Sequence, residues 1–362
     1  MPVAGAWGAV YTEAMPVTRD DVARAAGVSV ATVSYVLNAG PRGVSDEKRQ
    51  RVLQAVAELG YRPNAIARSL RARRTNILGL VLPNSASPYF AALAHAIEEA
   101  AAARGYQVVV SNASDSPERE AAQIEALLRL RVDGLVWIPA DLRSTERHAA
   151  RAVRPDVPTV QVDRALAGGG DSYDVVVPDN AGGGRLAADH LVALGHRRVA
   201  VVAGRRGHLH AQQRLAGARS RLAEAGIDLP ARYVASGDFT YAAGARATAC
   251  WLELPPGERP TAIVAGNDRT AIGALYAAAG AGVRVPEELS VVGFNDVPQA
   301  AYTVPALTTI AQPLAEIGAA AVDRLLTRVE RPERAPPPEQ CVLPVRLVVR
   351  GSTAPPPYSG AM

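Results

Sequence analysis

Cysteine and lysine are scarce in this chain, and so are aromatic residues and long apolar runs. Cys250 and Cys341 lack the spacing of metal ligands, and two cysteines do not make a disulfide framework. No run of about 18 apolar residues is present, which excludes a membrane-spanning helix. Residues 1–14 lack the basic start of a signal peptide. We therefore expect a cytoplasmic protein, with residues 1–15 as a disordered extension.

The sequence also lacks the patterns of an enzyme. Glycine clusters at 168–170 and 182–184 do not form GxGxxG after the first strand of a βαβ unit. His190 and His196 fall in helix and turn patterns, and no Ser/His/Asp arrangement is present. We therefore expect no catalysis, no cofactor and no metal site.

Residues 17–38, VTRDDVARAAGVSVATVSYVLN, predict two short helices joined by a glycine turn. Thr18 is placed to cap the first helix, with Asp21 at the capping-box position. Gly27 supplies the turn, and Ser29 is placed to cap the second helix. This spacing is typical of a helix-turn-helix, whose second helix enters the DNA major groove, although an ordinary helical hairpin shares it.

A third helix follows, with Ser45 as its cap and Gly60 as its stop. Its apolar positions, and those of the two helices before it, are Val22, Ala23, Ala26, Val33, Val36, Leu37, Val52, Leu53, Val56 and Leu59. Residues 15–75 hold 11 Lys/Arg and five Asp/Glu, so they carry +6 while the whole chain carries +4. All the excess positive charge thus lies on the candidate DNA module, as a phosphate-facing surface requires.

From residue 77 onward, short apolar runs alternate with helical patterns, which predicts parallel sheets covered by helices. The pattern restarts near residue 176, so we expect two doubly wound α/β lobes with ligand at the carboxyl ends of their strands. CVLPVRLVVR is predicted as one last strand, and residues 354–362 form a tail.

The chain resembles the lac repressor/galactose repressor family of bacterial transcription regulators over roughly residues 16–353. The matching blocks include VTRDDVARAAGVSVATVSYVLN, VSDEKRQRVLQAVAELGYRPNAIARSL, RVDGLVWIPA, AIVAGNDRTAIGAL, SVVGFNDVPQA and LTTIAQPL. The resemblance implies an all-α headpiece at 16–62, a hinge helix at 63–75 and a periplasmic-binding-protein-like domain at 76–353. It implies lobe 1 at about 76–175 and 305–335, and lobe 2 at about 176–304 and 336–353.

The function implied is a sequence-specific repressor whose operator affinity is controlled by a small effector between the lobes. No heptad pattern follows Arg350, which favours a homodimer, and a two-fold dimer implies a palindromic operator. We expect the effector to be a carbohydrate. The alternatives are an enzyme on a nucleotide-binding fold and a solute-binding protein, which would need a signal peptide and no basic headpiece.

DNA contacts are expected from the start of the second helix. Val30 and Ala31 can touch thymine methyl groups, and Tyr35 can donate to a base edge or a phosphate. The family usually has polar side chains at one or both of the first two positions, so this chain departs from the pattern. The full set expected at DNA is Thr18, Ser29, Val30, Ala31, Thr32, Ser34, Tyr35, Asn38, Asn64, Ala67 and Leu70. The resemblance makes Leu70 the apolar wedge of the hinge helix in the minor groove; packing of Leu70 on the lobe is the alternative.

Effector contacts are carried over from the family by motif. The polar set is Asp163, Arg214, Asn267, Asn295 and Gln312, and the candidate apolar walls are Phe90, Trp137 and Phe239. Amide and charged groups can bond sugar hydroxyls, and arginine can bond a carboxylate or a phosphate. The family often has Asp where Asn295 stands. Each aromatic residue could instead belong to a lobe core, and Asp163 could be a helix cap.

Overall fold

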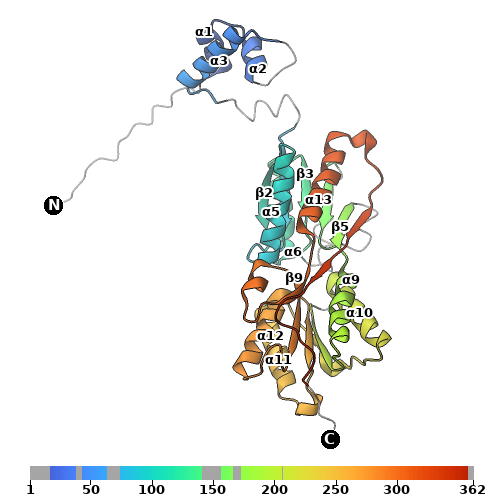
Figure 1. Ribbon diagram of the computed structural model, residues 1–362. Helices are drawn as coiled ribbons and strands as arrows, with labels where there is room; N and C mark the ends of the chain where they lie inside the picture. The colour runs from blue at the N-terminus through green and yellow to red at the C-terminus, as the bar shows by residue number, and fades with distance from the viewer. Residues whose placement is uncertain are drawn as a thin grey trace, which may run out of the picture. The chain divides into compact units, whose positions relative to one another are not determined.

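The computed structural model describes residues 17–37, 43–62, 74–140, 156–165, 173–205 and 207–357 (Figure 1). The chain divides into two compact units, Met1–Thr75 and Asn76–Met362. Within the described residues, no helix has the length and apolar character needed to cross a bilayer. The expected N-terminal extension, most of the expected hinge and the end of the tail lie outside the described residues, and so do Asn38, Asn64, Ala67 and Leu70.

The first unit contains the three predicted helices, α1 (Arg19–Ala26), α2 (Val30–Leu37) and α3 (Asp46–Glu58). One fully buried valine from each helix, Val22, Val33 and Val52, forms the centre of a small core. A core of this size buries little apolar surface, so the capping interactions at the helix ends contribute much of the stability of the helices. The predicted helices and the α1 face of Val22, Ala23 and Ala26 are confirmed.

The third helix differs from its prediction in which residues it buries. Leu53 is 49% exposed and Leu59 is also exposed, whereas Ala55 is buried beside Val52. Because α1 and α2 have only eight residues each, the surface that they present to α3 is narrow, and small side chains of α3 are enough to fill it. Ser45 stands at the N-cap of α3, but its side chain makes no capping hydrogen bond.

The second unit contains two α/β lobes, as predicted. The sheet of lobe 1 has the order β11-β5-β4-β3-β1-β2, and all its strand pairs are parallel. Its strands are β1 (Ile77–Leu82), β2 (Gln107–Asn112), β3 (Gly134–Trp137), β4 (Thr159–Val162), β5 (Asp174–Pro178) and β11 (Gln340–Leu343). Helices α5 (Pro88–Ala103) and α13 (Leu314–Glu330) lie side by side on one face, and α6 (Pro117–Arg129) packs on the other (Figure 1).

The sheet of lobe 2 has the order β12-β10-β9-β8-β6-β7, and only the β10–β12 pair is antiparallel. Its strands are β6 (Val199–Ala203), β7 (Val234–Ser236), β8 (Ala262–Ala265), β9 (Ser290–Asn295), β10 (Thr308–Ala311) and β12 (Arg346–Val348). Helices α9 (Asn180–Ala193) and α10 (Leu209–Glu224) cover one side, and α11 (Tyr241–Leu252) and α12 (Asp268–Gly280) cover the other (Figure 1). Short 3₁₀ helices are η1 (Ala231–Tyr233), η2 (Pro256–Glu258), η3 (Pro298–Tyr302) and η4 (Pro332–Arg334).

The lobe boundaries differ from those expected from the sequence. Strand β5 belongs to lobe 1 and β10 to lobe 2, and CVLPVRLVVR is two strands, β11 and β12, in different sheets. β5 and β10 are buried along their whole length, so their sequences look alike and do not show which sheet each strand joins. β11 is a partly exposed edge strand. The chain therefore crosses between the lobes three times, after β5, after β10 and after β11.

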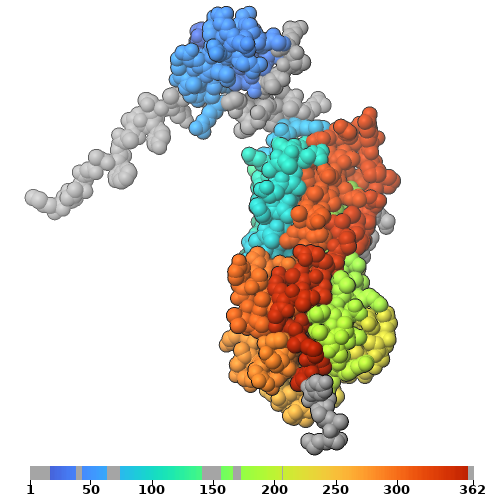
Figure 2. Space-filling model, viewed as in Figure 1, coloured from blue at the N-terminus to red at the C-terminus, as the bar shows by residue number. Residues whose placement is uncertain are grey.

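The C-terminal segment is part of the surface of lobe 2. It runs between the α9–α10 and α11–α12 pairs, where Figure 2 shows it in dark red. Ser352 is fully buried there, and its hydroxyl donates to the Val291 carbonyl at 2.6 Å and accepts from the Thr308 amide at 2.8 Å. These buried hydrogen bonds hold the chain on lobe 2 after its third crossing between the lobes.

Candidate DNA-binding and effector-binding sites

The helix-turn-helix of the first unit is held by its capping groups. The Asp21 amide donates to the Thr18 hydroxyl, and the Thr18 amide donates to the Asp21 carboxylate at 2.9 Å, which completes the predicted capping box. This bonding holds the pKa of Asp21 below its usual value. Gly27 ends α1 at φ +62°, a left-handed conformation that glycine adopts without strain. The Thr32 amide donates to the Ser29 hydroxyl, so Ser29 caps α2 as predicted.

The outer side of α2 carries the side chains expected at DNA. Ser29, Val30 and Ala31 are exposed at its start, while Val33 and Val36 face the core. Thr32, Ser34 and Tyr35 are half-buried, and Thr18 is exposed at the start of α1. A surface of hydroxyl, methyl and phenol groups can bond phosphates and touch thymine methyls without a buried charge.

A cleft separates the two lobes at the carboxyl ends of their strands. It encloses about 730 Å³, part of which is open to solvent. Lobe 1 lines it with Asn84, Ser87, Tyr89, Phe90, Asp115, Ala140, Asp163 and Arg164; lobe 2 lines it with Arg205, His208, His210, Arg214, Asp238, Phe239, Asn267, Arg269 and Asn295. Six of the eight residues expected at the effector are in this lining: Phe90, Asp163, Arg214, Phe239, Asn267 and Asn295.

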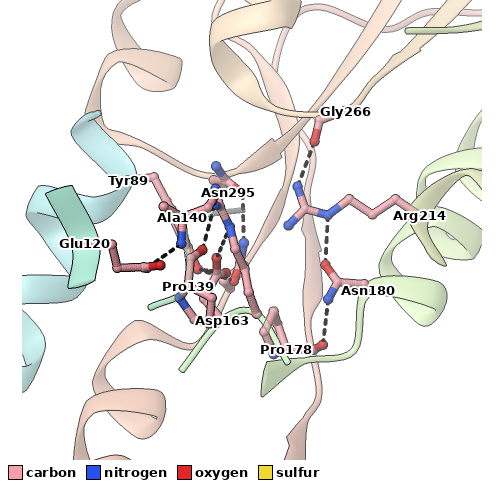
Figure 3. A network of polar contacts seen from close by, with 12 residues as sticks. Tyr89, Glu120, Pro139, Ala140, Asp163, Pro178, Asn180, Arg214, Gly266 and Asn295 are labelled. Carbon is pink, nitrogen blue, oxygen red and sulfur yellow. Dashed lines mark hydrogen bonds and ion pairs between the residues drawn. The ribbon is translucent and has the colours of Figure 1, made fainter. Parts of the chain in front are cut away.

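A chain of buried polar groups joins the lobes at the back of the cleft (Figure 3). The Tyr89 hydroxyl donates to Asp163 Oδ1 at 2.6 Å and lies 2.8 Å from Gln312 Oε1. The Gln312 amide donates to Asn295 Oδ1 at 2.8 Å. Burial and the Asp163 charge raise the pKa of Tyr89 well above its usual value, so its proton stays in place. Gln312 does not line the cleft itself; it follows β10 on a crossing segment and orients the residues that do.

Arg214 projects from α10 into the cleft and is 8% exposed. Its Nε donates to Asn180 Oδ1 at 2.8 Å and its Nη1 to the Gly266 carbonyl at 2.7 Å (Figure 3). The guanidinium also stacks on the Phe294 ring at 3.7 Å. Burial lowers the pKa of Arg214 to about 10, which still leaves the side chain charged at neutral pH.

Two glycines permit the close packing of α9 and α10 that carries Arg214. A Cβ at Gly184 would lie 2.0 Å from the Arg214 carbonyl oxygen, and one at Gly217 would lie 1.9 Å from the Ala181 carbonyl oxygen. Only a hydrogen fits at either position, because backbone atoms occupy the space on the facing helix. The 182–184 glycine cluster therefore allows α10 to pack close to α9, and this packing positions Arg214 in the cleft.

On the lobe 2 wall, Asn267 and Phe239 support each other. The Asn267 side chain caps α12 by accepting from the Thr270 amide and donates to the Phe239 carbonyl at 3.1 Å. The Phe239 ring stacks on His210 with ring centroids 5.4 Å apart. Burial and the nearby guanidinium groups hold the pKa of His210 well below its usual value, so this ring is neutral.

Trp137 is not a wall of the cleft. It is fully buried in the lobe 1 core against α6, and its Nε1 donates to Glu120 Oε1 at 2.8 Å. Odd and even positions of a strand face opposite sides of the sheet, and Trp137 faces the side covered by α6. Phe90 does line the cleft, at 6% exposure, beneath the Arg164 guanidinium.

Several cleft residues were not singled out from the sequence. Arg164 and Tyr89 are the most buried charged and hydroxyl groups among them, and His208 and His210 form the start of α10. Two of them lie next to residues that were predicted from the sequence: Arg164 follows Asp163, and Tyr89 precedes Phe90. The histidines gave no signal, because α10 reaches the cleft only through its packing on α9.

Three cleft residues adopt positive φ angles that side chains rarely take. These are Asp163 at +65°, Phe239 at +63° and Asn295 at +114°. Each costs free energy of order 1–3 kcal/mol, and such residues cluster at ligand clamps. Backbone strain is therefore concentrated at the cleft, where it orients side chains toward the ligand site.

The chain resembles known regulators along most of its length. Residues 18–64 match the family described as bacterial regulatory proteins, lacI family, and residues 188–353 match the periplasmic binding protein-like domain. The ribose operon repressor of Escherichia coli K12 is 36% identical over 315 residues, which cover 87% of this chain and 94% of the relative.

Solved structures give the same result. A lac repressor dimer bound to operator and the anti-inducer ONPF superposes with a TM-score of 0.80 at 33% identity, covering 94% of this chain and 99% of the other. A CelR–cellobiose complex superposes with a TM-score of 0.69 at 31% identity, covering 93% and 99%. The chain therefore belongs to the lacI family of bacterial regulatory proteins and is a DNA-binding transcriptional repressor, not an enzyme.

Proposed function

We propose that this repressor loses or gains operator affinity when a small polyhydroxylated effector, a sugar or sugar derivative, binds in the cleft. The observation that carries the proposal is the chain of buried polar groups formed by Asp163, Tyr89, Gln312 and Asn295, with Arg214 opposite. A ligand with several hydroxyl groups can satisfy such groups, whereas an apolar ligand would leave them unpaired. The cellobiose bound to CelR, which is similar in fold, supports the same class.

Coupling between cleft and DNA follows from the way the lobes are joined. The cleft residues come from both lobes, and three chain crossings connect them. A ligand that touches both walls favours the lobe arrangement in which both sets of contacts form. Operator affinity changes only if that arrangement differs from the one that fits DNA.

We infer that the DNA side acts as a homodimer on a palindromic operator in the cytoplasm, at the nucleoid. The solved lac repressor relative is a dimer on operator. Lobe 2 exposes large apolar residues that suit contact with a second copy, among them Tyr302 at 86% and Val304 at 97%. Each protomer then presents one α2 helix to one half-site.

The test uses the full-length protein. Operators are selected from a random DNA pool and matched to the native genome. Anisotropy titrations then measure the operator dissociation constant with a panel of sugars and sugar derivatives, and with purines and amino acids. We expect a site with inverted symmetry, an affinity that falls steeply with salt, and at least one carbohydrate that shifts it by tenfold or more. A purine or amino acid that shifts it while every carbohydrate is silent would reject the effector class.

A further inference from the structure

The charges inside the cleft do not balance. Two guanidinium groups from opposite lobes, Arg164 and Arg214, are each 8% exposed, and the only buried carboxylate in the described lining is Asp163. At the rim the charges cancel, because Arg205 and Arg269 are matched by Asp115 and Asp238. The interior therefore carries a net positive charge.

Arg164 uses the one buried carboxylate. Its Nε lies 3.6 Å from Asp163 Oδ2, and its Nη1 donates to the carbonyls of Pro139 and Ala140 at 3.0 and 2.9 Å. Its guanidinium carbon lies 5.1 Å from the centroid of the Phe90 ring. Arg164 Nε is buried and makes no hydrogen bond within the described residues, so its contact with Asp163 is a long ion pair rather than a hydrogen bond.

Arg214 has only uncharged neighbours within bonding distance. It is bonded to the Asn180 amide and the Gly266 carbonyl and stacked on Phe294, and no ion pair to it occurs among the described residues. Asp163, which also faces Arg164, and to a lesser degree Asp268 influence Arg214 from farther away. The oxygens of Asp268 accept from the Val297 amide and the Thr309 hydroxyl. Burial raises the pKa of Asp268 to about 7, so it is only partly ionised at neutral pH.

The other polar groups around Arg214 add no negative charge. Position 295 holds an amide, which accepts from Gln312 and adds no charge. His210 carries no charge either, since its pKa is held well below its usual value. Two buried guanidinium groups that share one fully ionised carboxylate are costly, and a bound anion lowers that cost while forming charge-assisted hydrogen bonds.

We propose that the effector is an anionic polyhydroxy compound, a sugar acid or a sugar phosphate, whose anionic group binds between Arg214 and Arg164. Its hydroxyl groups then bind Asp163 and Asn295. This inference rests on the proposed function and narrows its ligand class. A carboxylate and a phosphate both match the geometry of the guanidinium donors. The experiment therefore includes both a sugar acid and a sugar phosphate.

Isothermal titration calorimetry on the full-length protein compares matched ligands at constant ionic strength. Each set contains a neutral aldose, its aldonate and its terminal phosphate ester, for example glucose, gluconate and glucose 6-phosphate, or the corresponding ribose series. We expect the anionic member of at least one set to bind ten times more tightly than its neutral parent, or better. The aldonate and phosphate arms show which anion the site prefers.

The decisive variant is Asn295→Asp, which keeps the shape and the acceptor for Gln312 but adds a carboxylate. It should weaken binding of the anionic ligand at least tenfold more than binding of the neutral parent. Gln212→Glu makes the same charge change at an exposed position of α10 and should alter neither affinity. Arg164→Gln should weaken the anion selectively, and Arg164→Lys should restore part of the loss.

A neutral sugar that binds as tightly as both of its charged derivatives would overturn this inference while the proposed function stands. Equal weakening of neutral and anionic ligands by Asn295→Asp would also overturn it, because that result indicates loss of shape. If no carbohydrate, neutral or charged, binds the protein or shifts its operator affinity, both the inference and the proposed function fail.

Discussion

The headpiece and the cleft of this repressor are built in opposite ways. Those groups expected at DNA that the structure describes lie within one continuous stretch, residues 18–35, and are oriented by local caps and a glycine turn. The groups of the cleft come from segments spread between residues 84 and 312, and they meet only because two sheets and a helix pair bring them together. DNA recognition therefore depends on local structure, whereas the effector site depends on long-range packing.

The largest effect should follow from a charge in the headpiece core. Val33 is fully buried among α1 and α3 residues, so Val33→Asp places a carboxylate where it has no partner. We expect loss of specific operator binding by more than a hundredfold, with the melting of the two-lobe unit unchanged in calorimetry. Leu53→Asp is the control, because Leu53 is half-exposed on α3. Operator binding by Val33→Asp at the wild-type level would contradict the assignment of DNA binding to this unit.

A change in the packing of α9 against α10 should instead weaken effector binding and leave operator binding intact. Gly184→Ala places a methyl group 2.0 Å from the Arg214 carbonyl oxygen, so α10 must move. We expect effector affinity to fall tenfold or more in calorimetry while operator affinity in the absence of effector changes little. Gly280→Ala is matched to it, since a Cβ there meets no atom within 4 Å. Indistinguishable behaviour of the two variants would mean that this packing does not position Arg214.

The difference between the regions also decides what could be predicted from the sequence. The helices of the headpiece and the capping box at Thr18 were predicted, because propensity, caps and glycine act within a few residues. The α/β lobes were predicted from alternating patterns, but β5, β10 and β11 were assigned to the wrong lobes. β5 and β10 are buried along their whole length, and the sequence of such a strand does not show which sheet it joins. β11 is separated from β12 by only two residues, so the sequence shows a single strand there.

The cleft could be predicted only in part, for the same reason. Polar residues at strand ends, such as Asp163 and Asn295, carry a positional signal, since ligands bind at the carboxyl ends of parallel strands. Trp137 lies on a strand that ends at the cleft, yet its side chain faces the other side of the sheet. Arg164 was signalled only by its position next to Asp163, and His210 became visible only through tertiary packing. The charge imbalance of the cleft also required the tertiary structure.

A moderate effect on the headpiece is expected from its N-terminal cap. Thr18→Ala removes the hydroxyl that accepts from the Asp21 amide, while the backbone amide of residue 18 can still donate to the Asp21 carboxylate. The loss should lower the free energy of unfolding of the headpiece by ~1 kcal/mol, as is typical for such caps. Thr18→Ser keeps the hydroxyl and should behave like the wild type. Circular dichroism melts measure the first quantity, and operator titrations run in parallel. A drop in operator affinity with no change in stability would make Thr18 a DNA contact rather than a cap.

The last expected effect is on stability alone and concerns pH and lobe 2. The pKa of Asp268 is raised from 3.8 to about 7 in the folded protein, so between pH 4 and 7 the native state binds more protons than the unfolded state. The free energy of unfolding contributed by this group should therefore fall as pH rises through that interval and level off above pH 8. Asp268→Asn should remove this slope in urea titrations. Parallel pH profiles for wild type and variant would show that Asp268 does not titrate there.

The central claim is that a ligand in the cleft controls operator affinity through Arg214. The most direct measurement is the operator dissociation constant, with and without each carbohydrate of the panel, for wild type, Arg214→Ala and the exposed α10 control Arg219→Ala. We predict that at least one carbohydrate shifts the wild type and Arg219→Ala by tenfold or more, while Arg214→Ala binds operator normally and shows no shift. The same shift in all three proteins would contradict the account.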